Sequence, residues 1–261
     1  MKIASFNING VKARIEALTA WLQSAQPDLV ALQEIKTVDE GFPVQMIEDL
    51  GYNVVVHGQK GFNGVALLSK LPLEDVTRGL PGDLEDEQAR YIEATVVGAR
   101  AVRIAGLYLP NGNPAPGPKY AYKLAWMERL RARAAELLAS EMPVVMLGDY
   151  NIIPEPRDAA NPGQWLDDAL FLPDSRAAFR RIAAQGWTDA LRDSDPFGPR
   201  GPFTFWDYQA GAWQRDNGIR IDHLLLSPQA ADLVRETGVD RDARAGEKPS
   251  DHVPVWVDLA A

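Results

Sequence analysis

Residues 142–151 read MPVVMLGDYN and residues 250–257 read SDHVPVWV, and these two stretches determine how the whole chain is interpreted. In each of them a short apolar run, typical of a buried strand, adjoins polar side chains. The first run ends at Asp149 and Asn151, and the second begins after Asp251 and His252. Carboxylates, an amide and an imidazole at strand ends are the groups that hold a divalent cation and activate water against a phosphate ester.

The composition indicates a globular protein without membrane segments. The chain has 261 residues, of which 46% are hydrophobic and 24% charged, enough for one large core or two modest ones. The net charge of −9 argues against a broad basic surface for nucleic acid, but acidic residues that ligate a metal also help to bind phosphate. The chain has no cysteine, no apolar run of membrane-spanning length and no secretory signal pattern. We therefore expect a cytoplasmic protein with no membrane partner.

Hydrophobic periodicity predicts alternating strands and helices. The strands are expected at 3–6, 29–32, 52–56, 65–68, 91–97, 101–107, 143–147, 203–208, 219–226, 234–239 and 255–259. The helices are expected at 11–25, 43–50, 119–140 and 175–185, and the polar stretch 152–174 is expected to be a long surface excursion. No composition break suggests a linker, so we expect a single domain over residues 1–261 with two packed sheets and outer helices.

Five basic residues fall on the longest predicted helix. They are Lys119, Lys123, Arg129, Arg131 and Arg133. Such a cluster is explained equally well by a solvated helix face and by local contacts to phosphate.

Eight polar residues come at the ends of predicted strands and form the candidate site. They are Asn7, Glu34, Tyr108, Asp149, Asn151, Asp222, Asp251 and His252. Each has an ordinary structural explanation on its own, but the strand ends of two packed sheets can meet in one cleft. Asp222 lies in a strongly apolar segment and needs a partner, because an unpaired buried charge is costly. His252 is the natural partner, and a core Asp–His pair without a catalytic role is the alternative.

Nine short motifs carry a resemblance that covers nearly the whole chain. They are SFNING (5–10), LQEIK (32–36), HGQKG (57–61), GVA (64–66), YLPNG (108–112), GDYN (148–151), FWDY (205–208), RID (220–222) and KPSDH (248–252). In this order they resemble the bacterial exodeoxyribonuclease III family, within the endonuclease–exonuclease–phosphatase superfamily.

The resemblance implies an α/β fold, a four-layer α/β-sandwich of two packed mixed β-sheets flanked by helices. It also implies a Mg²⁺-dependent phosphodiesterase, with Mn²⁺ able to substitute. The expected substrate is double-stranded DNA with abasic sites or 3′ ends. The enzyme would cut 5′ to an abasic site and remove nucleotides or blocking groups from 3′ ends. A monomer is the default expectation.

The resemblance also gives the candidate residues their roles. Glu34 is implied as the principal metal ligand, assisted by Asn7 and Asp251, and the wider ligand set includes Asp149, Asn151 and His252. Asp149 is implied as the general base or water-positioning carboxylate, although the sequence leaves open whether Asp149 or the His252–Asp222 pair takes the proton.

Three further roles follow from the family likeness. Asn151 would orient the water or the phosphate, and His252, paired with Asp222, would donate to the phosphate. Tyr108 would hydrogen-bond a phosphate oxygen or help the leaving group.

The implied substrate contacts lie on other segments. Phe205, Ile219 and Ile221 match positions that line a small apolar pocket for a flipped-out abasic sugar, with ordinary strand core as the alternative. Lys36 and Asn111 would face the site rim or the DNA backbone. Residues 152–174 depart from the family pattern, so the balance between abasic endonuclease and 3′ exonuclease activity stays open.

The chain lacks features expected of other members of the superfamily. A secreted deoxyribonuclease would use a second catalytic histidine, and neither His57 nor His223 is placed for that role. Inositol-polyphosphate phosphatases carry an arginine soon after the GDxN string and a later cysteine, whereas Ile152 and Ile153 follow here. No aromatic membrane loop of the sphingomyelinase kind is evident. A non-catalytic binding module would have lost at least one of the key polar residues.

Overall fold

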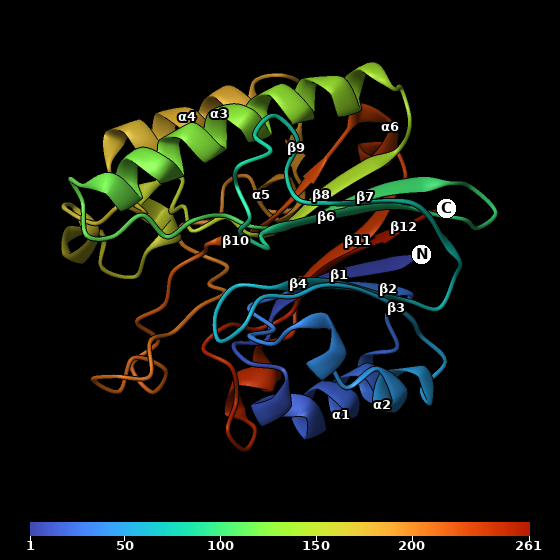
Figure 1. Cartoon of the computed structure of the whole chain (residues 1–261). Helices are drawn as coiled ribbons and strands as arrows, with labels where there is room; N and C mark the ends of the chain where they lie inside the picture. Colours follow the sequence, from blue (N-terminus) through green and yellow to red (C-terminus); the bar gives the residue numbers. More distant parts are fainter.

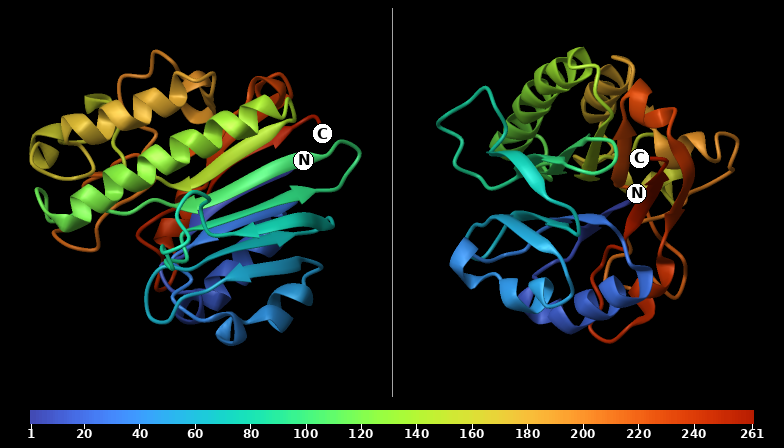
Figure 2. Two further views of the ribbon diagram at one scale, coloured as in Figure 1. Left: turned by 45° about the horizontal axis from the view of Figure 1, so that its top comes forward. Right: turned by 90° about the vertical axis from the view of Figure 1, so that its right-hand side faces the viewer.

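The computed structural model describes residues 1–261 and contains two six-stranded β-sheets packed face to face, with helices on both outer sides (Figures 1 and 2). The first sheet consists of β1 (Lys2–Asn7), β2 (Leu29–Gln33), β3 (Asn53–His57), β4 (Val65–Ser69), β11 (Val234–Val239) and β12 (Val255–Leu259). The second consists of β5 (Leu73–Arg78), β6 (Tyr91–Val96), β7 (Val102–Tyr108), β8 (Val144–Asp149), β9 (Thr188–Asp189) and β10 (Asp222–Leu226).

The α-helices are α1 (Ile15–Ala25), α2 (Val44–Glu48), α3 (Pro118–Ala139), α4 (Pro173–Ala183), α5 (Ala190–Asp193) and α6 (Pro228–Ala231). Short 3₁₀ turns are η1 (Lys12–Arg14), η2 (Asp39–Gly41), η3 (Pro156–Asp158), η4 (Pro162–Trp165) and η5 (Arg241–Ala245). No helix is both long and apolar enough to cross a membrane.

Each sheet is mixed and contains one parallel pair of strands. The strand orders are β11-β12-β1-β2-β4-β3 and β5-β6-β7-β8-β10-β9. The pair β1–β2 is parallel in the first sheet and β7–β8 is parallel in the second, while the other pairs are antiparallel. The carboxyl ends of parallel strands are where α/β proteins place their ligands.

Three apolar clusters separate the four layers. The central one lies between the sheets and includes Ile3, Leu67, Val145 and Leu224. A second lies between the second sheet and α3 and α4, and a third between the first sheet and α1 and α2. In Figure 1 these helices appear above and below the sheets, with both termini on one side. This arrangement confirms the predicted four-layer α/β-sandwich.

Gly148 permits the close approach of β7 and β8 directly before Asp149. A Cβ atom on Gly148 would lie 1.8 Å from the carbonyl oxygen of Leu107, well inside van der Waals contact. Only glycine fits at such a position, so the GD pair in the sequence brings the Asp149 carboxylate to the end of a tightly packed parallel pair.

Most predicted elements are confirmed, and three predictions are wrong. Residues 203–208 do not form a strand, because Phe205 makes only isolated bridges to Ile219 and His252 while the flanking residues have no ladder partner. The expected strand 219–226 begins only at Asp222. The stretch 152–174 is not simply a surface excursion, since its two ends bury Ile153 and Phe171 in a cluster of their own.

Candidate active site

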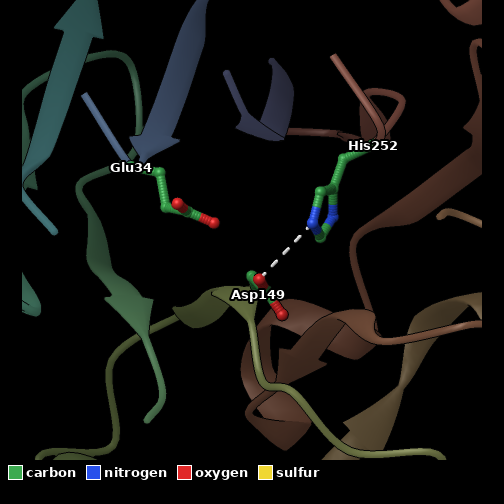
Figure 3. Close-up of side chains that lie close together, drawn as sticks. All are labelled: Glu34, Asp149 and His252. Carbon is green, nitrogen blue, oxygen red and sulfur yellow. Dashed lines mark ion pairs between the residues drawn. The ribbon is translucent and has the colours of Figure 1, made fainter. Parts of the chain in front are cut away.

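The carboxyl ends of both parallel pairs bring four candidate residues together. Asn7 ends β1 and Glu34 directly follows β2, while Tyr108 and Asp149 end β7 and β8 and face each other in register. Because the sheets are stacked, these strand ends meet at one edge of the sandwich. Figure 3 shows Glu34 and Asp149 reaching toward the same space from different elements.

Asp222 and His252 join this edge from later in the chain. Asp222 is the first residue of β10 and lies opposite Asp149 in the antiparallel ladder. His252 comes just before β12 and is fixed by its bridge to Phe205. The segments that begin and end the chain are therefore brought together by the pairing of β1 with β12.

One chain of contacts links the polar groups across the two sheets. His252 Nδ1 lies 2.9 Å from Asp222 Oδ2, and His252 Nε2 lies 3.6 Å from Asp149 Oδ2 (Figure 3). The Asn7 amide nitrogen donates to Asp149 Oδ2 at 3.0 Å and to Glu34 Oε1 at 2.9 Å. A change in the charge of one group therefore alters the electrostatic environment of its neighbours in this chain of contacts.

Burial and neighbouring charges shift the pKa values of the central groups. Burial raises the pKa of the Asp149 carboxyl, and the adjacent His252 only partly opposes this. Burial by itself would lower the pKa of His252, but Asp222 and Asp149 outweigh it and raise that pKa above its usual value. The imidazole therefore sits between two carboxylates in a setting that favours its protonated form.

The pKa values of Glu34 and Tyr108 are shifted in opposite directions. Burial would raise the pKa of Glu34, yet Lys36 and the Asn7 hydrogen bond lower it overall. Burial raises the pKa of Tyr108 well above its usual value, and Glu34 and Asp149 add to that shift. Glu34 therefore stays ionised, while the phenol keeps its proton and can donate it in a hydrogen bond.

Asn151 is held in a single orientation beside Asp149. Its backbone lies in the left-handed region with φ of 47°, which asparagine tolerates better than most residues. Its N–H donates to Asp149 Oδ1 at 2.8 Å, and its side-chain nitrogen donates to the Leu109 carbonyl at 2.8 Å. Its Oδ1 accepts from Asn111 at 3.2 Å.

The donor set fits a divalent cation. One ligand atom each from Glu34, Asp149 and His252 lies within 4.8 Å of the other two. Two carboxylates in a partly buried cluster suit hard cations such as Mg²⁺ and Mn²⁺. Lys36, whose ammonium is 2.9 Å from Glu34 Oε2, supplies the local positive charge in this arrangement.

Two of the expected ligands are less directly placed. Asn7 turns its NH₂ group toward the carboxylates, while its Oδ1 accepts from the backbone of Asn9 at 3.0 Å. Asp251 stands outside the three-residue cluster, with its Oδ1 accepting from Asn9 at 3.0 Å and from Ser250 at 3.3 Å.

The expected pocket residues form an apolar wall next to His252. The partly exposed Phe205 ring meets the His252 ring edge-on, with 5.0 Å between the centroids. Ile219 and Ile221 are buried beneath it, and Trp165 packs on the same cluster. Only Phe205 and Trp165 thus offer surface to a ligand, while the two isoleucines support them.

Sequence reasoning missed Thr204 and Trp165. The Thr204 hydroxyl donates to Asp222 Oδ2 at 2.7 Å and accepts from the Asp222 N–H at 3.2 Å, so it fixes the carboxylate that holds His252. No motif marks Thr204, because this contact depends on two loops meeting. For Trp165, the only indication in the sequence was that a tryptophan occurs within residues 152–174, the stretch that departs from the family pattern.

The five basic residues on α3 do not share one environment, since some are exposed, some are held in ion pairs and one is buried. Arg129 pairs with Asp86, Arg133 with Glu93 at 2.7 Å, and Arg131 with Glu128 at 2.9 Å. Lys123 is fully buried, and burial lowers its pKa to about 7. Only Lys119 is exposed without an ion pair.

Two stacked mixed sheets with paired carboxylates and a carboxylate-bound imidazole at their strand ends define a class of metal-dependent phosphoesterases. The sequence profile described as the Endonuclease/Exonuclease/phosphatase family matches residues 4–252. The chain belongs to this family.

Individual relatives cover the chain from end to end. Exodeoxyribonuclease III of Haemophilus influenzae is 39% identical over 99% of this chain and 100% of its own length. An AP endonuclease from Archaeoglobus fulgidus has a TM-score of 0.94 at 35% identity, with both chains covered completely. A 3′ phosphatase from Neisseria, solved bound to a product DNA hairpin, has a TM-score of 0.95 at 35% identity, again with full coverage of both chains. These likenesses agree with the resemblance that the motifs indicated.

Proposed function

We propose that this protein is a metal-dependent DNA-repair nuclease. It hydrolyses the phosphodiester 5′ to abasic sites in double-stranded DNA and removes nucleotides or blocking groups from 3′ ends. The main support is the unbroken line of contacts from Asp222 through His252, Asp149 and Asn7 to Glu34. The full-length likeness to an exodeoxyribonuclease III and to an AP endonuclease supports the choice of substrate.

The cofactor in this proposal is Mg²⁺, with Mn²⁺ able to replace it. Glu34 is its principal ligand, and Asn7, Asp149, Asn151 and Asp251 make up the remaining candidates. His252 could join them only as a neutral ring, whereas in this proposal it stays protonated. When bound, the cation polarises the scissile phosphate and stabilises the leaving oxygen.

Asp149 orients the attacking water and accepts its proton. Its Oδ1 is fixed by the Asn151 N–H, and its Oδ2 lies between Asn7 and His252. His252 is the weaker candidate for the base, because a carboxylate faces each of its ring nitrogens and favours the protonated ring. His252 instead donates a hydrogen bond to a phosphate oxygen, and Asp222 holds it in that orientation.

Tyr108, the last residue of β7, and Asn111, in the loop after it, also contact the phosphate. The Arg90 guanidinium lies 4.9 Å above the Tyr108 ring, and Arg90 Nη1 donates to the Tyr108 carbonyl at 3.3 Å. These contacts fix the ring of Tyr108 beside Glu34, and its phenol, which keeps its proton, donates to a phosphate oxygen or the leaving group once DNA is bound. Asn111 is linked to Asn151 and shares its role in orienting the substrate.

The apolar wall formed by Phe205 and Trp165 accepts the abasic deoxyribose. A sugar without a base can lie against these rings, whereas an intact nucleotide would have to bring its base into the same space. Ile219 and Ile221 keep the wall rigid from below. Lys36 at the rim contributes positive charge near the DNA backbone.

The first test compares substrates under one set of conditions with Mg²⁺. We expect incision of a duplex with one tetrahydrofuran abasic site, removal of a 3′-phosphate from a nicked duplex, and no internal cutting of the intact duplex. Denaturing gels of end-labelled strands measure all three activities. Equal rates on inositol polyphosphates, or cutting of intact duplex at the abasic rate, would exclude the proposed substrate.

A further inference from the structure

Lys123 of α3 is a fully buried lysine whose amine reaches the back of the active site. Its Nζ donates to the carbonyl oxygen of Asn151 at 2.6 Å and to that of Asn111 at 3.0 Å. Its side chain has no exposed surface. It thus touches the backbone of two residues whose side chains face the site, without itself entering the site.

Burying this amine is unfavourable unless hydrogen bonds inside the protein compensate for its lost hydration. Removing an amine or ammonium from water is strongly unfavourable unless its N–H groups are hydrogen-bonded inside the protein. The inward face of α3 around Lys123 is otherwise apolar, with Trp126, Met127 and Leu130 buried in the core. A methionine of similar length would pack there without that cost, so the contribution of Lys123 lies in its two bonds.

Those two bonds hold together the loops that follow β7 and β8. On the site side the same loops are joined by side chains, since the Asn111 amide donates to Asn151 Oδ1. Lys123 joins them from behind through their carbonyls. Asn151 is the more important of the two contacts, because its N–H donates to Asp149 Oδ1 and so orients that carboxylate.

The loop after β7 is shaped around the lysine stem. A Cβ on Gly112 would lie 2.6 Å from Lys123 Cδ and 3.1 Å from Ala169 Cβ, and Gly112 has φ of +92°. The chain therefore needs glycine there to pass over the lysine. This packing is independent of the hydrogen bonds and points to the same contact.

We propose that Lys123 is a positioning residue for phosphodiester hydrolysis: its amine ties the Asn111 and Asn151 carbonyls together and so sets the placement of Asn151 and Asp149 relative to the bound phosphate. This inference rests on the proposed function. The charge state is not essential, since the ammonium and the neutral amine both carry enough N–H groups for two bonds.

The first experiment is Lys123→Met, which keeps an unbranched side chain that is one atom shorter and removes both donors. Displacement of reacting groups by about 1 Å can cost 10²-fold in rate, so we expect kcat on the abasic duplex to fall about 10²-fold. The KM for the same duplex should change less than about threefold, because Lys123 does not reach the DNA-facing surface. Leu130→Ala, a buried change on the same helix, should lower the thermal midpoint and leave kcat unchanged.

A chemical rescue separates the amine from the packing. The chain has no cysteine, so Lys123→Cys carries a single thiol that can be alkylated in denaturant before refolding. Bromoethylamine restores a side chain of lysine length with its amine, while propyl bromide gives the same length without it. Wild-type protein taken through the same steps controls for refolding.

We expect the aminoethyl form to recover most of the wild-type kcat and the propyl form to stay as low as Lys123→Met. Equal kcat in the two alkylated forms, or wild-type kcat in Lys123→Met, would overturn the inference. If Lys123→Met does not fold, the two alkylated forms still decide the matter. Wild-type protein that fails to cut abasic DNA would instead refute the proposed function.

Discussion

Asp149→Asn is expected to lower single-turnover incision of an abasic duplex about 10³-fold, within the range for loss of a general base. The substitution keeps the shape of the side chain and the hydrogen bond from the Asn151 N–H to Oδ1. It removes the negative charge that would accept the proton of the attacking water. The loss should therefore fall on the chemical step and not on DNA binding.

The same variant should fold with a thermal midpoint close to that of the wild type. Burial works against the charged form of Asp149, and Asp222 and Glu34 repel it, while His252 attracts it. A neutral amide removes the burial penalty and the repulsion, but its NH₂ group takes the place of Oδ2 and faces the Asn7 amide and His252, so we expect the gain and the loss to offset each other. Asp258→Asn, a partly exposed change on β12, serves as the matched control. Activity within tenfold of wild type in Asp149→Asn would mean that another group accepts the proton.

Asp222→Ala is expected to lower turnover about 10²-fold while the protein still folds. Asp222 Oδ2 holds His252 at 2.9 Å and Thr204 at 2.7 Å, so its removal frees the imidazole to turn away from the phosphate. Leaving two buried polar groups without an acceptor costs about 1–3 kcal/mol each. Part of that cost is offset, because Asp222 Oδ1 is buried and has no hydrogen-bond partner to lose.

Thermal unfolding and single-turnover kinetics on the same preparation distinguish the two roles of the Asp222–His252 pair. Glu93→Gln supplies the control, because Glu93 is a fully buried carboxylate that pairs with Arg103 and Arg133 away from the site. That control should lose stability and keep its turnover. If Asp222→Ala behaves in the same way, or fails to fold, the pair is a structural core contact.

The layout of the fold could be predicted from the sequence where an apolar strand adjoins polar residues. β8 is followed by polar residues and β12 is preceded by them, and both strands were correctly predicted. β5 was missed because it is an edge strand with two consecutive exposed acidic residues, Glu74 and Asp75, and a register shift, so no apolar run marks it. Residues 203–208 were wrongly predicted as a strand, because their aromatic rings pack on loops instead of a neighbouring strand. For example, Trp206 packs on Trp213 and Arg241.

The candidate site was predictable for the residues that end strands and not for those that reach it from elsewhere. Glu34 and Asp149 follow apolar runs, so their convergence could be expected from the stacking of two sheets. Thr204 and Lys123 act through contacts that exist only once distant segments pack together. The sequence does not distinguish Lys123 from the other basic residues of α3. Lys123 is the buried one because of the way the helix packs on the sheet.

The most direct test of the central claim, that these strand ends form one metal-assisted hydrolytic site, is a Mg²⁺ titration of abasic-duplex incision by metal-stripped wild type and Glu34→Gln. We expect no incision in EDTA and full recovery with Mg²⁺ in the wild type, leaving a 3′-hydroxyl that a polymerase can extend. Glu34→Gln should need at least about tenfold more Mg²⁺ to reach half its maximum rate, because a neutral amide is a weaker ligand than a carboxylate. Full activity in EDTA, or the same Mg²⁺ requirement in both proteins, would show that these residues do not form a metal-assisted site.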